Sequence, residues 1–421
     1  MDWQVIDLSG AQGASENPSK NLIMTLPSFF LLFQIPSLHC SQWHALERTM
    51  TQQITKDIAY DAVDPKDFPA MLEVDRYGKR STAFDKIISA THDHFWDPLD
   101  KKYIDFSEPF DLTKEMVLPD DFFPIFKTRL GETLTEAQKI KFASESTRWQ
   151  LSAILHGEQG ALALSASLCH ILRDPGAQEY AANQTREEAR HVTAFAAYIK
   201  ARWGTPLPCG ETLKNLLTEM VLAPEVYKKI VGMQMLVEGL AMGAFATLYQ
   251  KSRDPLLVKL CQLVMTDEAF HHKFGKIWAD RTIPKLSPEE HNIVEDWAAQ
   301  CFQTLLFNLV NPLQMKPVYE SIGLNPQEAM DAIQEAFGDA ERREQMKQSA
   351  NIFRVLIKTL LNAGIVTDRT KAFYGMYVDM DELKNEGDRM VGDDIAEEGI
   401  RYLQTINFSD KSKGQALLAA E

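Results

Sequence analysis

Apolar residues recur at the three- and four-residue spacing of amphipathic helices along most of the chain beyond residue 135. The stretches with this spacing are rich in Ala, Leu, Glu and Lys. No segment shows the alternating β-branched pattern of a strand. The pattern therefore predicts an all-α protein. Long helices are expected near residues 135–172, 175–203, 225–252, 255–282 and 287–311, and shorter ones near 326–337, 341–362 and 390–405.

Turn signals separate these helices and set the expected domain organisation. Asp174 and Asp254 are each followed by Pro, which is typical of an N-cap with Pro at the first helical position. A Gly- and Pro-rich stretch separates the second helix from the third, and many Pro residues interrupt the chain before residue 130. We expect three parts: a helical and irregular extension at 1–130 that packs on the rest, a helical bundle at 131–311, and a helical extension at 312–421.

A repeat with an offset of 80 residues is the most informative feature of the sequence. Each copy contains a Glu, a turn with the sequence Arg-Asp-Pro, and a Glu-x-x-His motif. The repeated residues are Glu158, Glu188 and His191 in the first copy and Glu238, Glu268 and His271 in the second. One Glu-x-x-His motif is common by chance, whereas two matched copies are a specific signal.

The spacing of the repeat brings its polar residues to one level. In each copy the two glutamates lie nearly equally far from the turn, roughly 21–24 Å along each helix at about 1.5 Å per residue. An antiparallel hairpin therefore places both carboxylates side by side, and the three-residue spacing puts Glu and His on one helix face. Two facing hairpins would bring four carboxylates and two imidazoles together.

A buried cluster of this kind needs cations to balance its negative charge. Glu158 and Glu238 both lie in strongly apolar stretches, so we expect them to be buried and not part of a solvated helix face. Four buried carboxylates are untenable without cations. Two divalent ions would balance their charge, and mixed oxygen and nitrogen ligands suit iron or manganese.

With this ligand set the chain resembles the ferritin-like non-haem di-iron carboxylate proteins. They include acyl-carrier-protein desaturases, multicomponent monooxygenase hydroxylases, ribonucleotide reductase small subunits and related N-oxygenases. The resemblance covers roughly residues 135–285 and implies a four-helix bundle that binds two metals. It implies one metal on Glu158, Glu188 and His191, the other on Glu238, Glu268 and His271, and bridging by Glu188 and Glu268.

The resemblance also implies residues behind the metal ligands. Acids at the positions of Asp267 and Glu187 often accept a hydrogen bond from a metal-bound imidazole on the opposite helix pair, which orients that imidazole. Arg190 has two interpretations, as a partner of an acid across the bundle or as a surface residue. His272 is an alternative to His271, but the repeat places Val192 at the corresponding position and so favours His271.

Some positions depart from the patterns of individual relatives. Hydroxylases and desaturases usually carry a Thr three or four residues after the third-helix Glu, where this chain has Ala241 and Met242. The N-oxygenases carry an extra His four residues before the last Glu, where this chain has Val264, which argues against arylamine N-oxygenation. Reductase subunits begin their ligand set with Asp, where this chain has Glu158. The resemblance therefore indicates the superfamily and leaves the branch open.

Small residues beside the ligands have two interpretations, close helix packing or space for a substrate. They are Gly157, Gly160, Ala161 and Ala163 near the first ligand, and Gly239, Ala241, Gly243 and Ala244 near the third.

Composition narrows the partners and the compartment. The 421 residues carry 59 acidic and 44 basic side chains, a net charge of −15 that argues against a nucleic-acid partner. The five scattered cysteines show no metal or disulfide pattern and favour a cytoplasmic location. The apolar stretch 22–36 is broken by Pro and too short to span a bilayer, so we interpret it as a buried or docking segment.

These features favour an oxygen-dependent di-iron oxidase or oxygenase that acts on a small or medium organic substrate. Hydroxylation, N-oxygenation, desaturation and oxidative C–C cleavage all remain open. The expected cofactors are two iron ions, with manganese as the alternative at one site, and O2. The alternatives are an iron-handling ferroxidase, which would not need such long extensions, and a non-catalytic subunit, which would not need an intact ligand set.

The electrons that such chemistry consumes need a source. The sequence has neither a dinucleotide-binding motif nor a cysteine cluster for an iron–sulfur centre, so an external reductase or ferredoxin is expected. By analogy we also expect homodimerisation through the flanking helices.

Overall fold

The protein is described from a computed structural model, which covers residues 60–310, 312–337, 351–385 and 392–418. Within these ranges the chain forms helices and turns, with no β-strand and one isolated bridge between Ala62 and Leu172. The predicted all-α class is therefore confirmed. The chain divides into two units, Met1–Thr49 and Met50–Glu421, and every described residue belongs to the second. The apolar stretch 22–36 lies outside the described residues.

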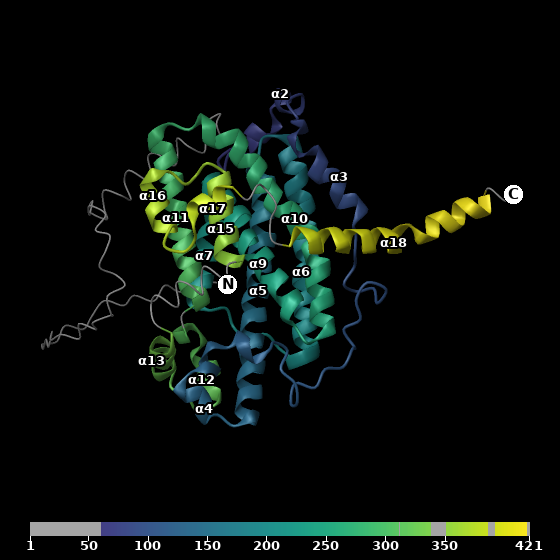
Figure 1. The fold of residues 1–421 in the computed structure, drawn as a ribbon. Helices are drawn as coiled ribbons and strands as arrows, with labels where there is room; N and C mark the ends of the chain where they lie inside the picture. The colour runs from purple at the N-terminus through teal and green to yellow at the C-terminus, as the bar shows by residue number, and fades with distance from the viewer. Residues whose placement is uncertain (1–59, 311, 338–350, 386–391, 419–421) are drawn as a thin grey trace, which may run out of the picture. The chain divides into compact units, whose positions relative to one another are not determined.

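Four long helices form the predicted bundle (Figure 1). Helix α5 (Glu136–Ile171) packs along α6 (Pro175–Trp203), and α9 (Glu238–Lys251) packs along α10 (Pro255–Thr282). The two hairpins meet where α6 contacts α10. The four helices run alongside one another in Figure 1, so that residues from both hairpins can reach a common centre.

Polar caps begin these helices at the positions that the sequence indicates. Asp174 Oδ1 accepts a hydrogen bond from the backbone N–H of Gly176 at 2.8 Å, and Asp254 Oδ1 accepts one from Leu256 at 3.0 Å. Such caps satisfy backbone donors that have no partner within the helix. Asp254 also accepts hydrogen bonds from Tyr198 and Arg202 of α6, so this turn ties the two hairpins together.

The third long helix departs from the predicted uninterrupted helix at 225–252. It consists of α8 (Val226–Lys229), the π-helix η5 (Ile230–Val237) and α9. All eight residues of η5 are buried, so no polar face marks the helical register in the sequence. Its wider turns end directly at Glu238, and such π-helical turns are frequent at functional sites.

The same stretch is the one described helix that is long and apolar enough to cross a membrane. The stretch is Val226–Lys251, and its most apolar window has a mean hydropathy of 1.4, with 72% of that window buried inside the protein. A buried core helix passes this test as readily as a membrane span does, so the finding is weak evidence for a membrane.

Further helices surround the bundle. Helix α7 (Glu211–Leu222), which the sequence did not predict, lies on α5, and Leu217 fills the space above Gly160. Helix α15 (Asn351–Asn362) packs on α9, and α18 (Asp393–Leu418) packs on α10. These two helices coincide with the described parts of the predicted helices at 341–362 and 390–405, except that α18 continues to Leu418.

The remaining elements are mostly short. The α-helices are α2 (Val74–Tyr77), α3 (Asp85–Asp93), α4 (Arg129–Thr133), α11 (Pro288–Val310), α12 (Lys316–Ser321), α13 (Pro326–Ala336), α16 (Asp368–Tyr374) and α17 (Met380–Lys384). The 3-10 helices are η1 (Phe68–Leu72), η2 (Thr82–Phe84), η3 (Asp120–Phe122), η4 (Pro124–Lys127), η6 (Ile283–Lys285) and η7 (Pro312–Met315).

A layer of polar residues divides the apolar core into two clusters. The first cluster, which we call the Tyr180 cluster, includes residues such as Tyr180, Leu236 and Phe274. The second, the Phe195 cluster, includes residues such as Phe195 and Phe245. On every bundle helix the chain passes from one cluster to the other at the level of the repeated Glu and His residues. Apolar packing on both sides therefore holds this polar layer in place.

Candidate metal centre

The structure brings the six repeated side chains together in the polar layer between the two clusters. Their ligand atoms fall into two overlapping groups, and within each group all atoms lie within 4.8 Å of one another. The first group contains Glu158, Glu188, His191 and Glu268, and the second contains Glu188, Glu238, Glu268 and His271. Glu188 and Glu268 belong to both groups, as bridging ligands would.

Both imidazoles point the same ring nitrogen at the carboxylates. His191 Nδ1 lies 3.4 Å from Glu158 Oε2, 3.4 Å from Glu188 Oε2 and 3.1 Å from Glu268 Oε1. His271 Nδ1 lies 3.1 Å from Glu188 Oε1 and 3.2 Å from Glu268 Oε2. Each bridging carboxylate thus turns one oxygen toward each histidine.

The donor set fits a pair of divalent metal ions. Three of its buried atoms have no hydrogen-bond partner: Glu188 Oε2, Glu268 Oε1 and His191 Nδ1. The ring nitrogen nevertheless lies 3.4 Å from the first of these oxygens and 3.1 Å from the second. Buried polar atoms that face each other without hydrogen-bond geometry are expected where an ion completes the contacts. The mixture of carboxylate oxygen and imidazole nitrogen suits iron or manganese.

Burial shapes the charges at the centre. Burial raises the pKa of Glu158 and of Glu238 well above the usual range, and the neighbouring carboxylates add to the rise at Glu238. Burial opposes ionisation of Glu188 and Glu268 too, but the imidazoles of His271 and His191 together outweigh it and lower the pKa of both. Without metal, protons therefore balance part of the negative charge.

The histidines carry some of these protons. Burial would lower the pKa of His191 and of His271, but the surrounding carboxylates outweigh it and raise both values well above the usual range. Two bound divalent ions would take over the role of these protons, because a metal-bound imidazole must be neutral.

The far side of each imidazole contacts an acid of the opposite hairpin. His191 Nε2 lies 2.8 Å from Asp267 Oδ2, and His271 Nε2 lies 2.9 Å from Glu187 Oε2. These are the contacts that the resemblance implied for Asp267 and Glu187. They fix which nitrogen of each ring faces the centre.

Asp267 is the acceptor of a larger buried network that sequence reasoning missed. Its carboxylate accepts hydrogen bonds from Arg190 Nε at 3.0 Å and from Trp96 Nε1 at 3.0 Å, and His94 Nε2 lies 3.3 Å away. Arg190 is therefore the partner of an acid across the bundle and not a surface residue. Trp96 and His94 come from the segment after α3. This segment is not part of the 80-residue repeat, so the sequence did not indicate that either residue reaches the centre.

Gln184 is a further residue at the centre that the sequence analysis did not identify. It lies on α6 one turn before Glu188 and is fully buried. Its Nε2 donates to Glu188 Oε1 at 3.1 Å and to Glu238 Oε1 at 2.9 Å. A buried Gln one turn before a repeated Glu was the available signal.

Four further histidines of the described residues lie apart from the cluster. His272 Nε2 lies 3.3 Å from Thr359 Oγ1 of α15, so His271 is the residue of this pair that faces the carboxylates. His156, His170 and His291 each contact a backbone carbonyl outside the polar layer.

Some of the small residues beside the ligands allow close helix packing, and one of them borders open space. A β-carbon at Gly160 would lie 2.7 Å from Leu217 Cδ2, and one at Gly239 would lie 3.3 Å from Leu356 Cδ2, so these positions allow close helix packing. A β-carbon at Gly157 would meet no heavy atom within 4 Å. Gly157 therefore has space for a larger side chain.

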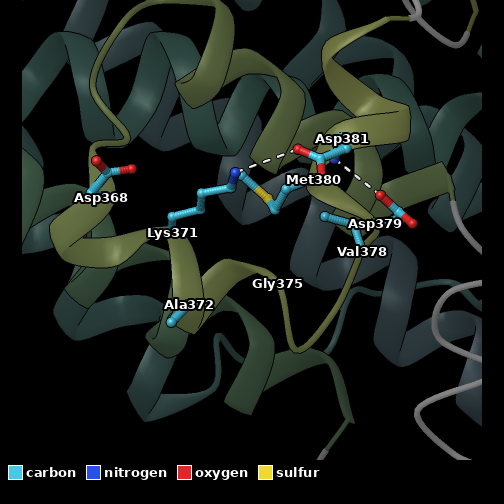
Figure 2. Close-up of a pocket in the computed structure, with 8 residues that line it drawn as sticks. All are labelled: Asp368, Lys371, Ala372, Gly375, Val378, Asp379, Met380 and Asp381. Atoms are coloured by element: carbon cyan, nitrogen blue, oxygen red, sulfur yellow. Dashed lines mark hydrogen bonds and ion pairs between the residues drawn. The ribbon is translucent and has the colours of Figure 1, made fainter.

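A separate open groove lies between α16 and α17, and its lining residues are drawn in Figure 2. Its volume is about 530 Å³. Three of its charged groups have partners: Lys371 Nζ lies 3.4 Å from Asp381, and Asp379 accepts the backbone N–H of Asp381 as the cap of α17. The groove contains none of the clustered Glu and His residues, so the chemistry belongs to the buried centre.

A helical bundle around a buried cluster of carboxylates and histidines is the arrangement of ferritin-like metal-binding proteins. Residues 78–360 match the model of the family described as p-aminobenzoate N-oxygenase AurF, and the chain belongs to this family. No curated protein matches the chain. Val264 in place of the extra His therefore does not remove the chain from the N-oxygenase family. The protein is an enzyme that uses O2 to oxidise a small organic substrate.

Proposed function

We propose that the protein binds two iron ions on Glu158, Glu188, His191, Glu238, Glu268 and His271 and oxidises the nitrogen of a small amine. The observation that carries the metal assignment is the pair of overlapping ligand groups that share Glu188 and Glu268. Family membership favours N-oxygenation over the other di-iron reactions. The irons would supply electrons to O2, and the protein would orient the substrate and exclude water.

The exposure of the six residues indicates the side from which the substrate approaches. Glu158 and Glu238 are 5% and 2% exposed, whereas the other four are fully buried. These two less deeply buried residues come from α5 and α9, and Gly157, where a β-carbon would meet open space, precedes Glu158 on α5. The opposite side is closed by Trp96 and Arg190. We propose that substrate reaches the centre between α5 and α9.

The metal assignment is tested by loading the metal-free protein anaerobically with ferrous iron. We expect about two irons per chain, and at most one in Glu188→Ala and in His271→Ala, since each variant removes a ligand. Glu179→Ala, which removes an exposed Glu of α6, should load as the wild type does. Wild-type loading below one iron per chain, or unchanged loading in both ligand variants, would refute the assignment.

The approach path is tested at Gly157. Gly157→Leu should retain two irons and a stable fold, because Leu favours a helix by about 0.8 kcal/mol over Gly and meets open space. Turnover of an arylamine should fall by about tenfold or more as the side chain narrows the path. Gln159→Leu, at an exposed position of the same helix, is the matched control. Equal turnover in both variants would place the path elsewhere.

The remaining proposals concern electrons, partners and compartment. An external reductase or ferredoxin supplies the electrons, manganese is the alternative ion at one position, and two chains associate as a homodimer. A cytoplasmic location is supported by the free cysteines at residues 169, 209, 261 and 301.

A further inference from the structure

The two halves of the repeat differ in the residues that flank the metal centre. Three positions on the side of the Tyr180 cluster are polar and fully buried, and their counterparts 80 residues away, beside the Phe195 cluster, are apolar. The pairs are Gln184 with Val264, Gln234 with Ile154, and Tyr180 with Leu260.

The polar flank has unsatisfied hydrogen-bonding atoms. Gln184 Oε1, both side-chain polar atoms of Gln234, and the Tyr180 hydroxyl are buried without a hydrogen-bond partner. Leaving such groups buried costs about 1–3 kcal/mol each, so a polar flank is not explained by stability of the core. Each of the three lies one or two helical turns before a repeated Glu, as Gln184 does before Glu188 and Gln234 before Glu238.

Gln184 connects this flank to one half of the centre. Its Nε2 binds Oε1 of Glu188, which is the oxygen that faces His271, and it binds Oε1 of Glu238. The other oxygen of Glu188, which faces His191, receives no contact from Gln184. On the opposite flank, Val264 has no polar side-chain atom with which to make such contacts.

We propose that Gln184 is a positioning residue that serves only the ion held by Glu238 and His271, which makes the two metal positions unequal. The amide orients two ligand carboxylates of that position, and the flank of Gln234 and Tyr180 keeps its surroundings polar. Residues that orient ligands in this way commonly change metal affinity by roughly 10–100-fold. This inference rests on the proposed di-metal function and deepens it.

The test separates the two positions with histidine variants of the full chain. His191→Ala keeps the metal position of Glu238 and His271 intact. His271→Ala keeps the metal position of Glu158 and His191 intact. Each background is titrated anaerobically with cobalt(II), whose visible absorption bands report coordination directly. In His191→Ala, adding Gln184→Met should weaken cobalt binding by roughly 10–100-fold and alter the bands. In His271→Ala the same change should shift affinity by less than about twofold.

Two further variants complete the design. Val264→Ala is the matched control on the apolar flank and should not alter cobalt binding in the His191→Ala background. Gln184→Glu should strengthen binding in that background alone, because it adds a carboxylate beside Glu188 and Glu238. A merely structural role for Gln184 would not produce effects of opposite sign at one position. If circular dichroism shows that Gln184→Met does not fold, the effect of Gln184→Glu on cobalt binding tests the role of Gln184 instead.

The outcomes distinguish this inference from the proposed function. Equal effects of Gln184→Met in both backgrounds, or no effect in either, would overturn the role of Gln184. Wild-type protein that binds fewer than two cobalt ions would instead overturn the di-metal assignment itself.

Discussion

Asp267→Ala should destabilise the protein by about 3–5 kcal/mol, the largest loss expected from any single change at the centre. Asp267 is fully buried and is the shared acceptor of Arg190, Trp96 and His191. Burial would raise its pKa, but Arg190 and the hydrogen bond of His191 outweigh burial and hold the pKa well below its usual range. Removing the carboxylate leaves a buried guanidinium and two buried donors without a partner.

The sign of the pH dependence follows from this lowered pKa. Asp267 contributes its full stabilisation above the unfolded-state pKa of about 3.8. The contribution is lost only as the pH falls through the lower pKa of the folded state. The cost of Asp267→Ala should therefore be fully present at pH 7.

Urea unfolding of the metal-free protein measures the cost, and Asp280→Ala provides the control. Asp280 lies on the same helix but is exposed, where it pairs with Lys276 at 2.6 Å. Removing such a surface ion pair should change the free energy of unfolding by less than about 1 kcal/mol. Asp267→Ala should also weaken iron binding roughly 10–100-fold, because His191 loses the group that orients it. A free energy of unfolding within about 1 kcal/mol of wild type would contradict this account of Asp267.

Metal loading should release protons and stabilise the protein more at higher pH. Glu158 and Glu238 have pKa values raised from 4.5, and His191 and His271 have values raised from 6.5. The raised pKa values favour the protonated forms of these four groups in the metal-free folded state, and two divalent ions would displace such protons. Neutral imidazoles and ionised carboxylates are the forms that bind metal.

The direction of the pH effect is set by the raised values. A group with a raised folded-state pKa stabilises the metal-free protein fully below its unfolded-state pKa, and this contribution is lost as the pH rises through the folded-state pKa. The metal-free protein should lose stability from about pH 4.5 for the carboxyl groups and from about pH 6.5 for the imidazoles. Bound metal removes this loss, so its stabilising effect should be larger at pH 8 than at pH 5.5.

Calorimetry in buffers of different ionisation enthalpy counts the released protons, and thermal unfolding with and without ferrous iron measures the stabilisation. At a hundredfold excess of iron over its dissociation constant we expect about 2.7 kcal/mol per ion. His271→Ala should release fewer protons because it lacks one imidazole and one ion. Loading without proton release, or a stabilisation that falls from pH 5.5 to pH 8, would refute the assigned protonation states.

Val264 departs from the pattern of the N-oxygenases at one position of the bundle. The extra His of the N-oxygenases is absent there, yet the chain matches that family over residues 78–360. Val264 is fully buried in the Phe195 cluster. A single residue can therefore depart from the pattern of the family while the match extends over most of the bundle.

The sequence by itself determined the helical bundle, its two matched hairpins and the six clustered side chains. Helical periodicity marks long amphipathic helices, and the turns at Asp174 and Asp254 set the register of each hairpin, so residues at equal distances from a turn must lie side by side. The three-residue spacing of each Glu-x-x-His motif likewise puts its Glu and His on one face of the helix.

The tertiary structure alone decided which residues outside the 80-residue repeat approach the centre. Trp96 and His94 reach Asp267 from a segment with no repeat, across 171 residues in the case of Trp96. The π-helix before Glu238 is fully buried and has no polar face, so its wider turns leave no periodic signal in the sequence. Gln184 gains its role from Glu238 on a different hairpin. Local spacing encodes contacts within a helix or across a short turn, whereas contacts between distant segments depend on how the whole chain packs.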